Sequence, residues 1–146
     1  MSTGLAWTRV ERRLQNAENY WIATTRPDGR PHAMPVYGIW HDGAFWFATG
    51  RHSVKGRNIA ANPGAVVHLE SGDDVVIVEG TAAEVTDAAR AAEVVPHLAG
   101  KYGMAAEEMT VGAEDSDAAL YVVRPRVVQA WLEGALPQTH SRWQLA

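Results

Sequence analysis

The stretch "YWIATTRPDGRPHAMPVYGIWHDGAFWFATG", residues 20–50, decides the fold class. β-branched and aromatic residues dominate it, and two turn signals interrupt it, a Pro-Asp-Gly at 27–29 and an Asp-Gly at 42–43. The stretch therefore predicts three strands joined as a meander. Pro35 removes one backbone donor from the second strand, and with Gly38 nearby it favours an edge position or a bulge.

The flanking sequence predicts helices inserted between further strands. Thr8 and Glu11 have capping-box spacing, and Ser53 and Asp87 are each placed to begin a helix. Pro96 should kink or split the last of these helices. The expected elements are a helix at 8–17, a helix from 53 to about 61, strands at 65–71 and 75–86, a helix at 87–102, an acidic loop at 105–117, one or two closing strands within 118–133, and a polar tail at 134–146.

Six or seven short strands with two helices inserted between them favour a closed or nearly closed antiparallel barrel. The predicted fold class is mainly β with inserted helices (α+β). The 146 residues are enough for one sizeable core and too few for two ordinary domains. We therefore expect a single domain over residues 1–146, with the barrel at 20–133.

Composition excludes several classes of function. The formal net charge of −4 predicts no nucleic-acid partner and no anionic membrane surface, so anion binding must come from a local patch. The chain has no cysteine, which removes disulfides, thiol nucleophiles and cysteine-based metal sites. No apolar run reaches the length of a membrane span or a signal peptide, so a cytoplasmic location is expected.

The segment "TGRHSVKGRNIAANPG", residues 49–64, is the basic patch that this acidic chain offers. Cations in the first turn of a helix lie at the wrong end for the helix dipole, which favours a bound phosphate there. The alternative is a basic surface helix that balances the acidic remainder of the protein. The glycine spacing is not that of a Walker loop. The segment contains no acid and four basic or potentially basic side chains: Arg51, His52, Lys55 and Arg57.

Other reactive side chains form no recognisable motif. The histidines have no metal-ligand spacing, so no metal is predicted. No Gly-x-Ser-x-Gly elbow accompanies Ser53, which disfavours a serine hydrolase. Most of the six tryptophans are interpreted as core or interface residues. Only Trp131 and Trp143, near the polar tail, are available to contact a flat aromatic ligand.

Four short motifs occur in a characteristic order: 31–36 (Pro-His-Ala-Met-Pro-Val), 47–49 (Phe-Ala-Thr), 53–55 (Ser-Val-Lys) and 62–63 (Asn-Pro). Together with the later "VVIVEGTAAEV", they resemble the pyridoxamine 5′-phosphate oxidase-like split β-barrel superfamily, whose fold is that of FMN-binding proteins. The resemblance covers roughly residues 18–133. The helix after the fifth strand and the terminal Ser-Arg-Trp resemble the flavin/deazaflavin oxidoreductases of the B group.

The resemblance implies a homodimer with a cofactor in the groove between two barrels. It also implies which residues hold the cofactor. The partner chain would complete the pocket with Trp131 and Arg142. The tricyclic ring would rest on the backbone of His32, Ala33, Met34, Pro35 and Val36, and the phosphate would be held by Thr49, Ser53, Lys55 and Arg57, with Arg51 or Arg57 available for tail carboxylates.

The function expected from this resemblance is hydride transfer between the deazaflavin coenzyme F420 and a small unsaturated or quinone-like substrate. FMN-binding members of the superfamily usually carry Arg-Lys where this chain has Val54-Lys55, which favours F420 over FMN. An FMN-dependent oxidase or reductase and a non-catalytic flavin or haem carrier remain alternatives. No catalytic residue is assigned, and Tyr37, His68 and His41 are all open as proton donors.

Overall fold

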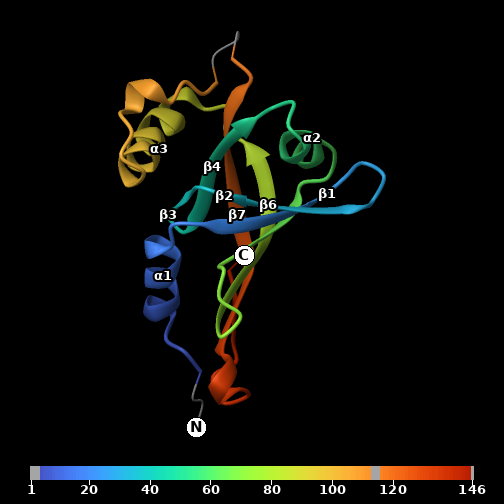
Figure 1. Ribbon diagram of the computed structural model, residues 1–146, viewed down its shortest axis with the longest axis vertical. Helices are drawn as coiled ribbons and strands as arrows, with labels where there is room; N and C mark the ends of the chain where they lie inside the picture. The colour runs from blue at the N-terminus through green and yellow to red at the C-terminus, as the bar shows by residue number, and fades with distance from the viewer. Residues whose placement is uncertain (1–3, 113–115, 146) are drawn as a thin grey trace.

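One antiparallel sheet organises the chain (Figure 1). The computed structural model describes residues 4–112 and 116–145. Three α-helices and two short 3-10 helices accompany the eight strands of this part. In chain order the elements are α1 (Trp7–Asn16), β1 (Tyr20–Thr25), β2 (Pro31–Val36), β3 (Ile39–His41), β4 (Ala44–Gly50), α2 (Val54–Ala61), β5 (Gly64–His68), β6 (Asp74–Glu84), α3 (Ala88–Lys101), η1 (Ala106–Glu108), β7 (Ala118–Leu132), η2 (Glu133–Ala135) and β8 (Ser141–Gln144).

The order of the strands makes the sheet curl into a split barrel. Its path is β2-β1-β5-β6-β7-β4-β3, so β2 and β3 lie at opposite ends. Only Tyr37 and Gly38 separate these two strands in the chain, so the ends of the sheet must come together. A Cβ at Gly38 would lie 2.3 Å from the ring of Phe45 and 2.7 Å from the backbone oxygen of Trp46. We call the junction of β2 and β3 the seam of the barrel, and only glycine fits at position 38 within it.

The expected split antiparallel barrel with inserted helices is therefore confirmed, but the predicted meander is corrected in one respect. Its second strand breaks at the seam into β2 and β3, which pair with different neighbours. Pro35 lies on β2, an edge strand of the sheet path, as its missing donor requires.

β6 and β7 form the long central pair of the sheet. β7 is one continuous strand, but the register shifts between Glu79 and Gly80 of β6, which pair with Val127 and Pro125, so Arg126 of β7 is the extra residue. The first half of β7 pairs with β4 and the second half with β8. The interpretation of 134–146 as a tail is thereby corrected: Ser141–Gln144 form a strand, because Trp143 packs on Trp7, with ring centroids 5.2 Å apart.

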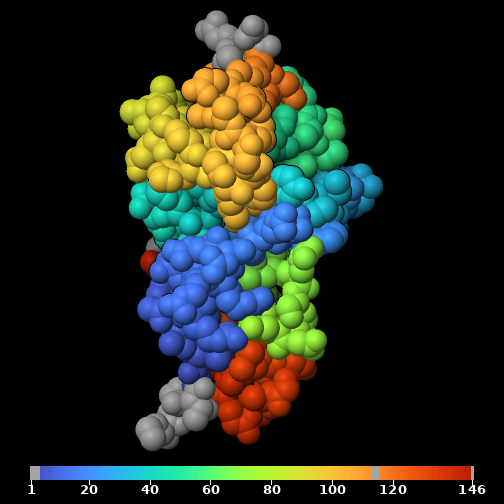
Figure 2. All heavy atoms as spheres, turned by 60° about the vertical axis from the view of Figure 1, so that its left-hand side comes forward, coloured from blue at the N-terminus to red at the C-terminus, as the bar shows by residue number. Residues whose placement is uncertain are grey.

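One apolar cluster lies on each face of the sheet, because successive side chains along β4 point to opposite faces. Phe45 and Phe47 point into the barrel, where they join residues of β1, β5, β6 and β7 and the buried side of α1. Trp46 points to the other face and packs with Leu98 of α3. In Figure 2, α3 and the segment after it cover the upper part of the molecule, and α1 lies below.

The ends of the helices follow the sequence signals in two of three cases. The side chains of Ser53 and Asp87 cap α2 and α3 as expected. Thr8 does not cap α1, which begins one residue earlier, and Glu11 instead accepts a hydrogen bond from Nε1 of Trp40 at 2.9 Å.

Two further expectations are modified. Pro96 neither ends nor splits α3, because buried apolar residues on both sides of it hold the helix against the sheet. The acidic loop at 105–117 includes the short η1, and its residues 113–115 lie outside the described part. No described helix is long and apolar enough to cross a membrane.

Candidate functional site

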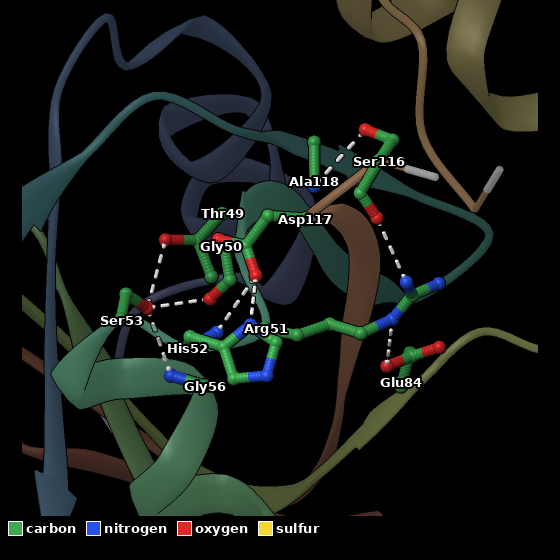
Figure 3. Close-up of polar contacts among 10 residues, drawn as sticks. All are labelled: Thr49, Gly50, Arg51, His52, Ser53, Gly56, Glu84, Ser116, Asp117 and Ala118. Carbon is green, nitrogen blue, oxygen red and sulfur yellow. Dashed lines mark hydrogen bonds and ion pairs between the residues drawn. The ribbon is translucent and has the colours of Figure 1, made fainter. Parts of the chain in front are cut away.

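A tight corner joins the end of β4 to the start of α2 (Figure 3). The Ser53 hydroxyl donates to the backbone oxygen of Gly50 at 2.7 Å and accepts from the N–H of Gly56 at 3.1 Å. Its single proton is therefore used within the corner. The hydroxyl of Thr49 lies 3.3 Å from Oγ of Ser53 and keeps a proton that it can direct to Ser53 or to a ligand.

Arg51 and His52, two of the four basic residues of segment 49–64, are paired with acids from elsewhere in the chain. Arg51 donates from Nε to Oε1 of Glu84 at 3.0 Å and from a terminal nitrogen to the backbone oxygen of Ser116 at 2.9 Å. Nδ1 of His52 contacts the carboxylate of Asp117. Figure 3 shows the Arg51 side chain running away from α2. The structure therefore does not bring Arg51 to the start of the helix with the others.

Lys55 and Arg57, by contrast, are free to meet an anion. Neither side chain has a hydrogen-bond or ion-pair partner within residues 4–112 and 116–145. In the same part of the chain, the backbone N–H groups of Val54 and Lys55 have no acceptor. The first turn of α2 thus combines two unpaired cations with two unpaired N–H donors at the positive end of the helix dipole. Such a turn suits a phosphate or a carboxylate.

His32 on β2 faces this turn. Burial first, and then the charges of Arg26 and Lys55, lower the pKa of His32 below its ordinary value. The ring is therefore uncharged at neutral pH. Its Nδ1 is buried without a hydrogen-bond partner within the described chain. β2 and α2 are held together nearby, because Asn58 of α2 donates to the Thr24 hydroxyl at 3.0 Å, and Thr24 pairs with His32 in the ladder.

A hollow of about 380 Å³ adjoins the first turn of α2. Arg26 donates to the backbone oxygen of Pro31 at 2.8 Å, and Arg30 is paired with Asp28. The arginines outnumber the acid around this hollow, so its potential is positive. Its lining residues are Arg26, Pro27, Asp28, Arg30, Val54, Arg57 and Asn58.

The edge strand β2 presents an open surface beside the hollow. Ala33, Met34 and Pro35 are exposed, while Val36 packs against the barrel core. In the described chain β2 pairs only with β1, so its other edge is open to a ligand or to a second chain. That this backbone supports a flat ring stays a prediction.

Trp131 lies near the end of β7 and Arg142 on β8, and the red C-terminal part of the chain occupies the lower part of Figure 1. Trp131 is near the end of β7, about 40 Å along the strand from Ala118, the residue that pairs with Gly50. Arg142 lies on β8, on the wall of a groove of about 560 Å³ that extends to Pro31. Within one chain, Trp131 cannot reach the first turn of α2, so the predicted site needs a second copy to include it.

Sequence reasoning missed several residues that shape the site. Glu84 and Asp117, which neutralise half of the basic segment, are distant in sequence and carry no motif. Arg26 and Arg30 flank the turn at 27–29, and this basic pair beside a turn was the available signal. Tyr102 was also missed: it stacks, with ring centroids 4.5 Å apart, on Tyr37, which the sequence already named as an open proton donor and which is 60% exposed.

A curled antiparallel sheet whose two end strands, β2 and β3, are joined by only two residues, together with inserted helices, defines the class of split β-barrel proteins. The family model for pyridoxamine 5′-phosphate oxidase matches residues 7–132, and the chain belongs to this family. The resemblance inferred from the short motifs is thereby confirmed at the level of the family and the superfamily.

Solved structures share the fold. The conserved hypothetical protein Rv2991 from Mycobacterium tuberculosis is 20% identical with a TM-score of 0.76, covering 88% of this chain and 86% of that one. A protein described as an F420 reductase is 27% identical with a TM-score of 0.62, covering 81% and 94%. HutZ, the haem storage protein from Vibrio cholerae, is 15% identical with a TM-score of 0.68, covering 86% and 91%. No functionally curated protein matches the chain.

Proposed function

We propose that the protein is an oxidoreductase that binds the deazaflavin coenzyme F420 between two copies of the chain and reduces a small unsaturated or quinone-like molecule. The observation that carries the proposal is the first turn of α2, where Lys55 and Arg57 and two backbone N–H groups have no partner within residues 4–112 and 116–145. Membership of a family of cofactor-dependent oxidases and the likeness to an F420 reductase support the class of activity.

The residues at this turn fit a singly charged phosphodiester better than the phosphate dianion of FMN. Val54 supplies no charge at the first helical position, and Arg51 is occupied by Glu84. Lys55 and the backbone N–H groups are then the main donors, together with the hydroxyl of Thr49. Ser53 contributes by capping α2 and not by donating, because its proton goes to Gly50.

Carboxylates that extend beyond the phosphodiester would enter the hollow beside α2. Of the two arginines considered for this role from the sequence, Arg57 lines the hollow and Arg51 does not. Each contact there is exposed to solvent and contributes about 1 kcal/mol or less. The affinity for a tailed cofactor should therefore fall with salt more than the affinity for FMN does.

The cofactor, when bound, supplies the hydride, and the protein supplies binding, orientation and exclusion of water. The backbone of residues 32–36 supports the flat ring. Among the three open proton donors, Tyr37 is best placed, because it directly follows this strand and its side chain is largely exposed. His68 is bonded to the backbone oxygen of Leu69, and His41 lies on β3 under α3.

Paired fluorescence titrations of the cofactor-free protein with F420 and FMN test the proposal. We expect tighter binding of F420, with an affinity that falls between low and moderate salt. Sub-micromolar binding of FMN with negligible affinity for F420 would reverse the choice of cofactor. A Soret band in the purified protein, together with no reductase activity, would show that the protein is a haem carrier and not an F420-dependent enzyme.

A further inference from the structure

Four potential metal ligands meet on the other side of the sheet, under α3. His41 ends β3, Asp42 follows it in the turn to β4, and Glu93 and His97 lie four residues apart on α3, hence on one face of the helix. The rings of His41 and His97 are stacked, with centroids 4.7 Å apart. This cluster is separate from the corner at the start of α2.

The distances around Nε2 of His41 are too long for hydrogen bonds; they are ion-pair distances, and they also suit ligands of a shared ion. Nε2 lies 3.7 Å from Oδ2 of Asp42 and 3.8 Å from Oε1 of Glu93, beyond hydrogen-bonding reach. Two ligands of a tetrahedral Zn²⁺, each about 2.1 Å from the ion, lie about 3.4 Å apart. Ligand atoms of these three residues all lie within 4.8 Å of one another.

Nε2 of His41 also needs a partner. The atom is shielded from solvent, and it has no hydrogen-bond partner among residues 4–112 and 116–145. A buried polar nitrogen without a partner costs free energy, and an ion between it and the two carboxylates would remove that cost. The orphaned nitrogen is thus an observation independent of the acidic side chains.

Arg90 holds both carboxylates in place without using all of their oxygens. It donates to Oδ2 of Asp42 at 2.9 Å and to Oε2 of Glu93 at 2.7 Å, and its guanidinium lies over the ring of Trp46. Oε1 of Glu93, the oxygen near Nε2 of His41, receives no hydrogen bond from it, whereas Oδ2 of Asp42 is shared between Arg90 and the space beside His41. Carboxylates that ligate metals are commonly fixed by such outer contacts.

We propose that His41, Asp42 and Glu93 form a binding site for one Zn²⁺ or a similar first-row transition-metal ion. Solvent completes the tetrahedron, since the side chains of Asp42 and Glu93 are about half exposed. His97 orients the ring of His41. The sequence predicts no metal because Glu93 is far from His41 along the chain, and only the packing of α3 on the β3–β4 turn brings them together.

Metal-stripped protein, titrated with Zn²⁺ in competition with a chromophoric zinc chelator, tests the site. We expect the wild-type chain to bind a single equivalent. The variants His41→Gln, Asp42→Asn and Glu93→Gln should each weaken binding at least about tenfold. Asparagine tolerates the positive φ of 52° at Asp42, and both amides keep an oxygen for Arg90, so these variants should stay folded.

His140→Ala is the matched control, because this exposed histidine lies at the far end of the molecule beside Gln129. Its affinity for Zn²⁺ should equal that of the wild type. Co²⁺ should give the intense visible absorption of a tetrahedral ion with the wild type and lose it with Glu93→Gln. The proposal is overturned if the wild type takes up no Zn²⁺ or if the three site variants bind Zn²⁺ as tightly as the wild type. It is also overturned if His140→Ala loses as much affinity for Zn²⁺ as the site variants do.

Discussion

Arg51 is bonded to Glu84, with Nε 3.0 Å from Oε1, and so the most conspicuous cation of segment 49–64 is turned towards β6 and away from the start of α2. His52 is likewise paired with Asp117. A segment that contains no acid in the sequence is therefore half neutralised by Glu84 at the end of β6 and by Asp117 just before β7. Lys55 and Arg57 carry the remaining charge, and this division of roles gives a direct test by substitution.

Lys55→Ala should weaken binding of the phosphate-bearing cofactor by about 1.5–3 kcal/mol, the range for a hydrogen bond to a charged group. The melting temperature should change little, because the side chain has no partner in the described chain to lose. Fluorescence titration measures the affinity, and thermal unfolding measures the stability.

Arg51→Ala is the comparison. It should leave the cofactor affinity nearly unchanged, and losing its half-exposed pair with Glu84 should cost about 1 kcal/mol of stability or less. A larger loss of affinity in the Arg51 variant than in the Lys55 variant would place the phosphate elsewhere.

His32 should report the charge of Lys55. The charge of Lys55 contributes to the lowered pKa of His32, so Lys55→Ala should raise this pKa towards its ordinary value. Inorganic phosphate bound at the same turn should raise it too, since an anion favours the protonated ring. NMR titration of the His32 ring protons measures both shifts. A pKa that responds to neither change would mean that His32 and the anion site are not coupled.

The stability of the fold should rise with pH through the range in which Lys101 titrates. Burial lowers the pKa of Lys101 to about 8 from an ordinary value of 10.5, against the opposing charge of Glu18. Between these values the unfolded chain holds a proton that the folded chain has released, so the free energy of unfolding increases with pH. Below about pH 8 the cost of burying the charge is fully present. Urea unfolding between about pH 8 and pH 10 measures the slope.

Lys101→Met removes this titration and should flatten the slope. It should also remove the hydrogen bonds that Nζ of Lys101 donates to the backbone oxygen of Gly38 at 3.0 Å and to the hydroxyl of Tyr20 at 2.8 Å. An unchanged slope in the variant would assign the pH dependence to another group.

Gly38→Ala should destabilise the protein by about 1–3 kcal/mol, as overpacking of a core does. The new methyl would meet the backbone oxygen of Trp46 as well as the ring of Phe45, and a backbone atom cannot move aside cheaply. Chemical unfolding measures the change. Gly72→Ala, where nothing lies within 4 Å of a Cβ, should stay within about 0.5 kcal/mol of the wild type. Equal effects at both positions would contradict the close approach at the seam.

Light scattering should give about twice the mass of the chain. The open edge of β2, with exposed Met34 and Tyr37, and the position of Trp131 far from α2 both call for a second copy. A stable monomer that binds cofactor with full affinity would remove the intersubunit site from the proposed function.

Local patterns were enough to predict most of the fold. Turn residues, caps and alternating apolar residues are short-range signals, and they place the helices that begin after Ser53 and Asp87 and nearly all of the strands. The strand β8 was missed because its sequence is polar and its stability comes from Trp143 packing on Trp7, a contact between the two ends of the chain.

The site was predictable only where its residues are close together in sequence. Thr49, Ser53 and Lys55 belong to one corner, and the resemblance of its short motifs to the family was enough to name them as candidates. The pairing of Arg51 with Glu84 depends on the register of β6 against its neighbours, which no local pattern specifies. The meeting of His41 with Glu93 and His97 depends in the same way on how α3 packs on the sheet.

The central position of β7 has a consequence for how the chain folds. The hairpins β1–β2, β3–β4 and β5–β6 can each form from neighbouring segments, but β4 gains its second partner only when β7, close to the end of the chain, pairs with it. Until then Phe45, Trp46 and Phe47 lack the part of their cover that β7 supplies, through Tyr121 and Val123 on one face and Leu120 and Val122 on the other. Folding should therefore be slow for the size of the protein, since its rate depends on closing this long loop. A ribosome-bound chain that stops before residue 118 should stay dependent on chaperones.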